Sequence, residues 1–262
     1  MITRSELVSF LQNYFQPFEE IFKTREMLAN GLQIAGVEDV TKVGLGVSAN
    51  LEFFQKAKAT GCNFLIVHHG LSFASAAGNG NRFPLYQEER IRFLFQNGMS
   101  LAGYHGMLDH HPEIGNNASV IRRLGGEVSG NIFDKWGWFG RFPEPKSLSE
   151  IIKQCENIYS HRGQVVGVKK DKVTVFAVVS GSGAIDYHNP AIMNEFVDNR
   201  IELEIVGDMR ENHPAIAREL GMTIAAFGHY NTETIGVINL GEVLKQNFPG
   251  LGVEFIDVPN DL

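Results

Sequence analysis

The chain has 262 residues and a formal net charge of -7, and 44% of its residues are hydrophobic while 20% are charged. This length and composition are typical of a globular protein that forms one large domain or two smaller lobes. The acidic balance and the lack of a basic run exclude broad binding to a nucleic-acid backbone, which requires clustered Lys and Arg.

Residues 1–20 predict an amphipathic helix rather than an export signal. Ser5 is a suitable N-cap residue, and apolar side chains from Leu7 to Phe15 recur on one helical face. Polar residues interrupt these apolar positions, and no long apolar span follows, so we expect neither export nor a membrane span. We expect both cysteines, Cys62 and Cys155, to be reduced thiols, which agrees with a cytoplasmic location.

After this helix the chain alternates between strand and helix signals, which predicts an α/β lobe. Strand composition is found at residues 40–49, 62–67 and 100–104. Helix signals are found at residues 50–60, 85–98 and 118–126. A Gly- and aromatic-rich stretch at 125–147 interrupts the alternation, so we place a domain boundary near residue 126.

The alternation resumes beyond this stretch and predicts a second α/β lobe. A helix is expected at 149–158, and residues 164–170 and 172–180 could form a hairpin. Alternating strand and helix signals then occupy residues 201–207, 213–220, 223–228, 234–248 and 252–259. The predicted domains are therefore an N-terminal lobe of residues 1–126 and a C-terminal lobe of residues 127–262, each with a mixed sheet flanked by helices.

Three apolar runs, at 64–70, 100–109 and 223–233, lead into histidines and carboxylates. Alternating β/α folds place their chemistry at the carboxyl edge of the sheet, so these runs predict a shared metal site. Its expected ligands are His68, His69, Asp109, His229 and Glu233. Three imidazoles and two carboxylates suit two first-row divalent ions, and iron, zinc, manganese, cobalt and nickel all accept them.

Local context supports two pairs of these ligands. His68 and His69 would point to opposite faces of a regular strand, so both reach one site only where the strand breaks, as Gly70 permits. His229 and Glu233 are four residues apart and would share one helical face. A glutamate at a solvated helix N-terminus would give the same pattern without a metal.

The segment around Asp109 holds several competing histidines. We expect Asp109 to be a ligand and His105 to lie beside the metals, where it could carry protons. His110 and His111 are expected to face solvent. The same segment could instead be a polar turn that is closed by Asn116 or Asn117 as the cap of the next helix.

Two bound metal ions would leave this site cationic, because four positive charges would face two carboxylates. Such a site attracts phosphate and lowers the pKa of a bridging water. The SGSG segment at 180–183 follows an apolar strand and would either bind phosphate through its N–H groups or form a tight turn. His213 either lines the same cleft or caps a helix, and we interpret His161 and His188 as surface residues.

The order of these motifs resembles the NIF-three-like family, whose members are called GTP cyclohydrolase I type 2 homologues. The motifs are HHG, HGMLD leading into GNNASVIRRLG, SGSG, GD with a following His, and GHYNTE. The resemblance extends from residue 30 nearly to the C-terminus. It implies two α/β lobes that face each other across a dinuclear metal site with the same five ligands, His105 near the metals, and homo-oligomers, often hexameric rings.

The leading hypothesis is a metal-dependent hydrolase of nucleotide-like or other phosphorylated small molecules, with His105 or His213 as proton carrier. The alternative is a non-catalytic iron-trafficking or interaction protein that uses the same ligands and binds metal reversibly. A structural zinc site is a third interpretation, but such sites usually use cysteine, and neither cysteine is near a proposed ligand. We therefore expect two divalent metal ions and a small anionic ligand, without nucleic acid or membrane as partners.

Overall fold

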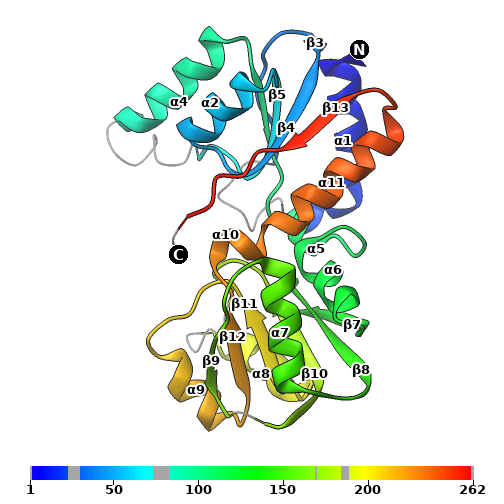
Figure 1. Cartoon of the computed structure of the whole chain (residues 1–262), viewed down its shortest axis with the longest axis vertical. Helices are drawn as coiled ribbons and strands as arrows, with labels where there is room; N and C mark the ends of the chain where they lie inside the picture. Colours follow the sequence, from blue (N-terminus) through cyan, green and yellow to red (C-terminus); the bar gives the residue numbers. More distant parts are fainter. Residues whose placement is uncertain (1, 23–29, 73–82, 169, 184–188, 261–262) are drawn as a thin grey trace. The chain divides into compact units, whose positions relative to one another are not determined.

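The computed structural model describes residues 2–22, 30–72, 83–168, 170–183 and 189–260. In these residues the protein is a mixed α/β structure, with sheets of two, five and six strands flanked by helices (Figure 1). The mixed sheets expected from the sequence are confirmed. None of the described helices has the length and apolar character needed to cross a membrane.

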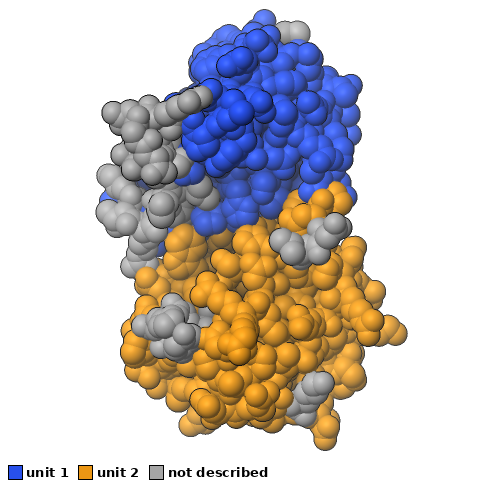
Figure 2. Space-filling view, turned by 90° about the vertical axis from the view of Figure 1, so that its left-hand side faces the viewer, with its two compact units in different colours: residues 1–108, 236–258 blue, residues 109–235, 259–262 orange. Residues whose placement is uncertain are grey.

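The chain divides into two compact units, shown in separate colours in Figure 2. Unit 1 contains residues 1–108 and 236–258, and unit 2 contains residues 109–235 and 259–262. The boundary that we expected near residue 126 therefore differs from the observed division. The difference arises because strand β13 (Gly252–Phe255) pairs in parallel with β4 (Lys42–Ser48), which assigns the C-terminal helix and strand to the sheet of unit 1.

Helix α1 (Arg4–Phe22) is the predicted amphipathic helix, and Leu7, Leu11 and Phe15 are buried on its inner face. The prediction that Ser5 caps it is wrong. The Thr3 hydroxyl accepts a hydrogen bond from the Glu6 N–H at 3.1 Å, and the Glu6 carboxylate accepts one from the Thr3 N–H at 2.7 Å. This reciprocal capping box satisfies two N–H groups that the first helical turn leaves open.

The five-stranded sheet of unit 1 has the order β13-β4-β5-β6-β2. Strands β4, β5 (Phe64–His69) and β6 (Ser100–Gly103) are parallel, whereas β2 (Gly31–Ile34) runs antiparallel to β6. The described residues of this unit also form the short pair β1 (Ile2–Thr3) and β3 (Asp39–Val40), and helices α2 (Leu51–Ala59), α4 (Leu85–Gln96) and α11 (Thr234–Asn247). The parallel strands end at one edge of this sheet, so residues that follow them lie close together.

The six-stranded sheet of unit 2 has the order β7-β8-β10-β11-β12-β9. Its centre consists of three parallel strands: β10 (Lys172–Val179), β11 (Leu203–Val206) and β12 (Thr223–Ala226). Antiparallel strands flank them: β7 (Glu127–Ile132), β8 (Gly137–Ser147) and β9 (Gln164–Gly167). Separate apolar clusters that include Phe176 and Phe196 form the core of this unit.

In the described part of the chain, helices lie before, between and after these strands. They are α5 (Gly106–His110), α6 (Asn116–Arg123), α7 (Leu148–Tyr159), α8 (Pro190–Asp198), α9 (His213–Glu219) and α10 (His229–Thr232). Helix α6 packs against β8 by close backbone approach. A Cβ atom on Gly140 would lie 2.5 Å from the Ile121 side chain and 2.7 Å from the Glu127 carbonyl oxygen, so glycine is required there.

Two predictions for this region are wrong. The expected hairpin of residues 164–170 and 172–180 does not form, because β9 pairs with β12 while β10 lies between β8 and β11. The Gly- and aromatic-rich stretch, which we did not assign to strands, forms the β7–β8 hairpin.

The two cysteines are free thiols, as predicted, and both are buried.

Candidate metal-binding residues

Unit 1 brings three histidines together. His68 and His69 are the last two residues of β5, and His105 comes two residues after β6. Their ring centroids are 4.7 to 5.2 Å apart, and their ligand nitrogens lie within 4.8 Å of one another. Imidazoles at this spacing can share a metal ion.

Hydrogen bonds orient the rings of this histidine cluster. The His68 Nδ1 atom lies 3.1 Å from the Tyr104 carbonyl oxygen, which can only accept, so Nδ1 carries the proton. The lone pair of a neutral His68 ring is then on Nε2, which is the form that a metal binds. The His69 Nδ1 atom is 3.1 Å from the Ser48 hydroxyl. At His105 the backbone N–H donates to the Asn30 side-chain oxygen at 2.9 Å, which holds the main chain at this residue.

Strand β5 ends at His69, directly before Gly70, but Gly70 does not have a positive φ, and the structure gives a different reason for a glycine: another side chain occupies the space of its missing Cβ. A Cβ atom there would lie 2.8 Å from the Gln33 side-chain carbon and nitrogen. The Gln33 amide donates to the Leu71 carbonyl and accepts from the Leu71 N–H, at 2.9 and 2.8 Å. Gly70 therefore lets Gln33 fix the backbone immediately beyond the histidines.

Unit 2 places His229 between two carboxylates. Its Nε2 atom lies 3.3 Å from Glu233 Oε1, and its Nδ1 atom lies 2.7 Å from Asp208 Oδ2. The hydrogen bond and charge of Glu233, together with those of Asp208, raise the pKa of His229 to about 9 against the effect of burial. Metal-free His229 is therefore protonated at neutral pH, and a metal that binds this ring displaces a proton.

Asp109 is buried in unit 2 and receives two hydrogen bonds on the same carboxylate oxygen. The Asn116 amide donates to Asp109 Oδ1 at 2.7 Å, and the Ser180 hydroxyl donates to it at 2.9 Å. The alternative in which Asn116 or Asn117 caps α6 does not hold, because Gly115 is the N-cap residue and both asparagines are buried in the first turn. They position Asp109 and the Ser180 backbone instead.

His110 and His111 are buried, so the prediction that they face solvent is wrong. The β7–β8 hairpin covers His110, whose Nδ1 atom is 2.9 Å from the Lys135 carbonyl and whose own carbonyl accepts from the Trp138 indole. The His111 Nδ1 atom accepts N–H groups from the turn that follows, at 3.2 and 3.3 Å. Burial lowers the pKa of His111 to about 4, so this ring is neutral.

The SGSG segment forms a tight turn rather than an open phosphate-binding loop. The Ser180 N–H donates to the Asn117 side chain at 2.8 Å, and the Gly181 N–H donates to the Thr232 hydroxyl at 3.0 Å. Gly181 has a φ of +63°, and a Cβ atom there would overlap Glu233 Oε1 and lie 3.1 Å from His229 Nε2. The turn thus contacts Asp109 through Ser180 and supports Glu233 through Gly181.

The other histidines have simpler positions. His213 is buried, and its Nδ1 atom accepts the Arg210 N–H at 3.0 Å, which supports the interpretation that it caps the turn before α9. His161 is half-buried, and His188 lies outside the described residues. Sequence reasoning missed Asp208 as a partner of His229, although its position two residues after a buried strand was a usable signal.

Comparisons with known proteins give a consistent result. The family model for Duf34/NIF3 (NGG1p interacting factor 3) matches residues 2–261. The "GTP cyclohydrolase 1 type 2 homolog" of Archaeoglobus fulgidus is 31% identical over 262 residues, which cover 98% of this chain and 99% of that protein. The protein of the same name from Escherichia coli K12 is 32% identical over 88% of this chain and 90% of its own length.

Solved structures share the whole fold. A crystal structure from Thermus thermophilus has 31% sequence identity and a TM-score of 0.82, and the match covers 100% of both chains. Reduced HcgD from Methanocaldococcus jannaschii has a TM-score of 0.81 at 22% identity, which shows a common fold alone. The motif order, the family model and the relatives agree, and the chain therefore belongs to the Duf34/NIF3 family.

Proposed function

We propose that this protein is a dinuclear metal-dependent hydrolase that acts on a nucleotide-like or other phosphorylated small molecule. The observation that carries the proposal is the carboxylate–histidine pair of Asp208 and His229, 2.7 Å apart, beside the buried Glu233. Metal-binding histidines characteristically use their second nitrogen in this way, since the partner fixes the ring and increases its basicity. The cyclohydrolase names of the relatives are consistent with this reaction class.

The residues present fit divalent first-row metals. We propose that His68, His69, Asp109, His229 and Glu233 hold two such ions, with His105 beside them. Imidazole and carboxylate donors suit iron, zinc, manganese, cobalt and nickel. Histidines 68, 69 and 105 and Glu233 are residues that could hold a metal ion. The tight fit between Gly181 and Glu233 supports a fixed carboxylate rather than a solvated one.

Each residue then has a defined task. When bound, divalent ions would supply Lewis acidity, a lowered pKa for a water nucleophile and attraction for the phosphate group of the substrate. Asp208 orients His229, and the Ser180 hydroxyl holds Asp109 at 2.9 Å. The ring of His105 lies within 5.2 Å of the neighbouring histidine rings, where it would be placed to accept or return the proton of a reacting water.

The test combines elemental analysis with a turnover screen of nucleotides and phosphorylated metabolites on protein purified without added metal. We expect about two metal ions per chain and hydrolysis of at least one compound. Glu233→Gln should lose at least one metal, whereas Glu219→Gln, which changes an exposed carboxylate of α9, should keep both. Two exchangeable metals without turnover would instead support the iron-trafficking role, and a full metal content in Glu233→Gln would refute the ligand assignment.

We also propose a cytoplasmic homo-oligomer, with a hexamer as the expected state. Helix α4 supports association because it exposes Leu85, Tyr86 and Phe95, which are 64%, 52% and 62% accessible in the single chain. Light scattering coupled to size-exclusion chromatography should give six times the chain mass of 29.1 kDa. A monomeric mass at micromolar concentration would contradict this assembly.

A further inference from the structure

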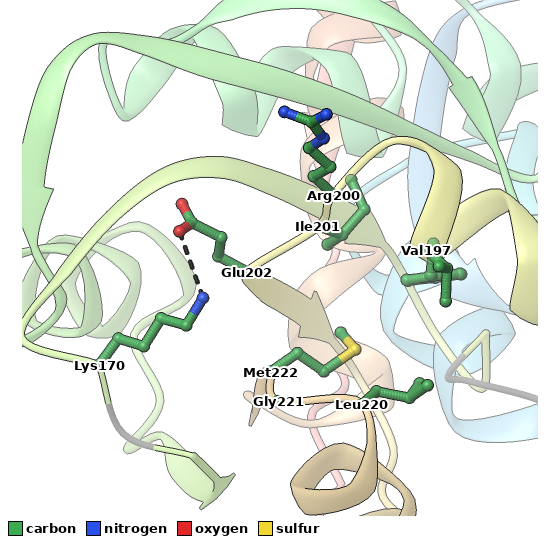
Figure 3. A pocket seen from close by; sticks show the side chains of 9 residues that line it. Lys170, Val197, Arg200, Ile201, Glu202, Leu220, Gly221 and Met222 are labelled. Atoms are coloured by element: carbon green, nitrogen blue, oxygen red, sulfur yellow. Dashed lines mark hydrogen bonds and ion pairs between the residues drawn. The ribbon is translucent and has the colours of Figure 1, made fainter.

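A separate cavity lies in unit 2, at the starting ends of β11 and β12, with a volume of about 350 Å³ (Figure 3). Glu202 and Met222 directly precede these strands, whereas Asp208 and His229 follow their other ends. At the strand rise of about 3.3 Å per residue, Glu202 and Asp208 are on the order of 20 Å apart. The cavity is therefore independent of the proposed metal ligands.

Apolar side chains form the floor of this cavity. Phe196, Ile201 and Met222 line it and also belong to the core of unit 2, so packing fixes their positions. Val197, which is 55% exposed, and the half-buried Leu220 lie at its rim. The volume is within the range of small-molecule sites. The cavity thus offers a preformed apolar surface of the size of a small ligand.

Three charged residues also line the cavity, and Figure 3 shows two of them, Lys170 and Glu202, side by side and Arg200 next to Ile201. The Glu202 carboxylate lies 3.4 Å from Lys170 Nζ and accepts the N–H groups of Thr174 and Val175, at 2.6 and 3.1 Å. Burial raises the pKa of Glu202, but these interactions outweigh it and lower the pKa. The pair is neutral overall. Among the described residues Arg200 has no carboxylate partner, so the cavity carries one excess positive charge.

The backbone at Arg200 is strained. Helix α8 ends in a Schellman motif, in which the Arg200 N–H donates to the Val197 carbonyl and the Ile201 N–H donates to the Phe196 carbonyl, both at 3.0 Å. This motif places Arg200 in the left-handed region, with a φ of +54°. Glycine is favoured at this position because a Cβ atom crowds the backbone there.

Helix α9, which borders the same cavity, ends in the same motif. The Gly221 N–H donates to the Arg218 carbonyl at 3.2 Å, and the Met222 N–H donates to the Ala217 carbonyl at 2.9 Å. Here the left-handed position is a glycine, with a φ of +69°. A cation elsewhere in the last helical turn would stabilise the helix C-terminus equally well without this strain, so the helix dipole does not explain an arginine at residue 200. We therefore attribute the strained backbone of Arg200 to the positive charge that this residue brings to the cavity.

We propose that this cavity binds a monoanionic small molecule with an apolar body, such as a carboxylate that carries an alkyl or aryl group. The Arg200 guanidinium binds the carboxylate through two parallel hydrogen bonds. The apolar body lies on Phe196, Ile201 and Met222. The single excess positive charge matches a carboxylate better than a phosphate dianion.

The test is a titration of the full chain with octanoate, followed through ¹³C-labelled methyl groups. The methyl signals of Val197, Ile201, Leu220 and Met222 should shift together, because all four residues line the cavity. Acetate, which has the carboxylate without the apolar chain, should leave them in place at the same concentration. Unmoved signals with octanoate, or equal shifts with acetate, would overturn the proposal.

Two variants test the role of charge. Arg200→Gly should raise the octanoate dissociation constant at least about tenfold, since a charge-assisted bidentate pair is lost. Its thermal stability should be unchanged or higher, because the left-handed strain is relieved. Val197→Asp places a carboxylate at the exposed rim and should also weaken binding. Arg141→Gln removes an exposed arginine of β8 as a control and should bind octanoate like the wild type. Wild-type affinity in Arg200→Gly or in Val197→Asp would refute the site.

Discussion

Replacing Gly181 by alanine should weaken metal binding far more than it weakens the fold. The φ of +63° makes any L side chain unfavourable, which costs about 1–2 kcal/mol of unfolding free energy. The new Cβ would also overlap Glu233 Oε1 and lie 3.1 Å from His229 Nε2, so the carboxylate must move. Disturbing the groups that position metal ligands typically lowers metal affinity by about 10–100-fold.

Gly125→Ala is the matched control for this variant. Gly125 also belongs to unit 2 and has a φ of +82°, but a Cβ atom there would meet nothing within 4 Å. Urea denaturation of the metal-free proteins should show a similar loss of stability in both variants. Competition with a chromophoric chelator should show weakened metal binding in Gly181→Ala alone. If Gly181→Ala bound metal with wild-type affinity, or if both variants lost metal affinity equally, the role of Glu233 as a positioned ligand would be refuted.

Two further substitutions test the electrostatics of unit 2. Asp208→Asn should lower the pKa of metal-free His229 from about 9, as followed by NMR titration, and should weaken metal binding by about tenfold. Because the folded pKa of His229 is raised, its protonation stabilises the metal-free fold below pH 6.5, and this contribution disappears as the pH rises through about 9. The stability difference between wild type and Asp208→Asn should therefore shrink over that range; a constant difference would contradict the pairing. His111 has a depressed pKa of about 4, so its neutral form stabilises the fold above pH 6.5 and this stability is lost as the pH falls toward 4. His111→Asn, which keeps an acceptor but does not titrate, should lose less stability between pH 7 and 4.5 in urea denaturation, and an equal loss would show that His111 does not drive acid unfolding.

The strands that carry the histidines could be predicted because buried parallel strands appear as continuous apolar runs. Strand β5 is buried from Phe64 to His68, and all of β12 is buried. The ends of these strands could therefore be located in the sequence, together with the residues that follow them. Helix α2 was equally clear from the helix signal at residues 50–60, and the structure adds that Asn50 caps it by accepting a hydrogen bond from the Phe53 N–H. Local signals of this kind depend on residues close together in the chain.

The errors have a different origin, because they depend on contacts between distant segments. Strand β9 pairs with β12, which lies almost sixty residues later, and no local pattern specifies that partner. His110 is buried only because the β7–β8 hairpin folds over it. The position of Asp208 after β11 indicates this edge of the sheet, but it does not specify the partner, since His229 is 21 residues away. Pairing and burial of this kind are determined by the tertiary structure.

The pairing of β13 with β4 has a consequence for synthesis of the chain. All strands of the sheet in unit 2 lie within residues 127–226, so a ribosome delivers them before residues 252–255 emerge. Until then β4 is an unprotected edge strand with open N–H and C=O groups, which is the kind of edge that recruits other chains. Truncation before Gly252 would make this temporary exposure permanent, and such a protein would be prone to aggregate even though its residues 127–226 are intact.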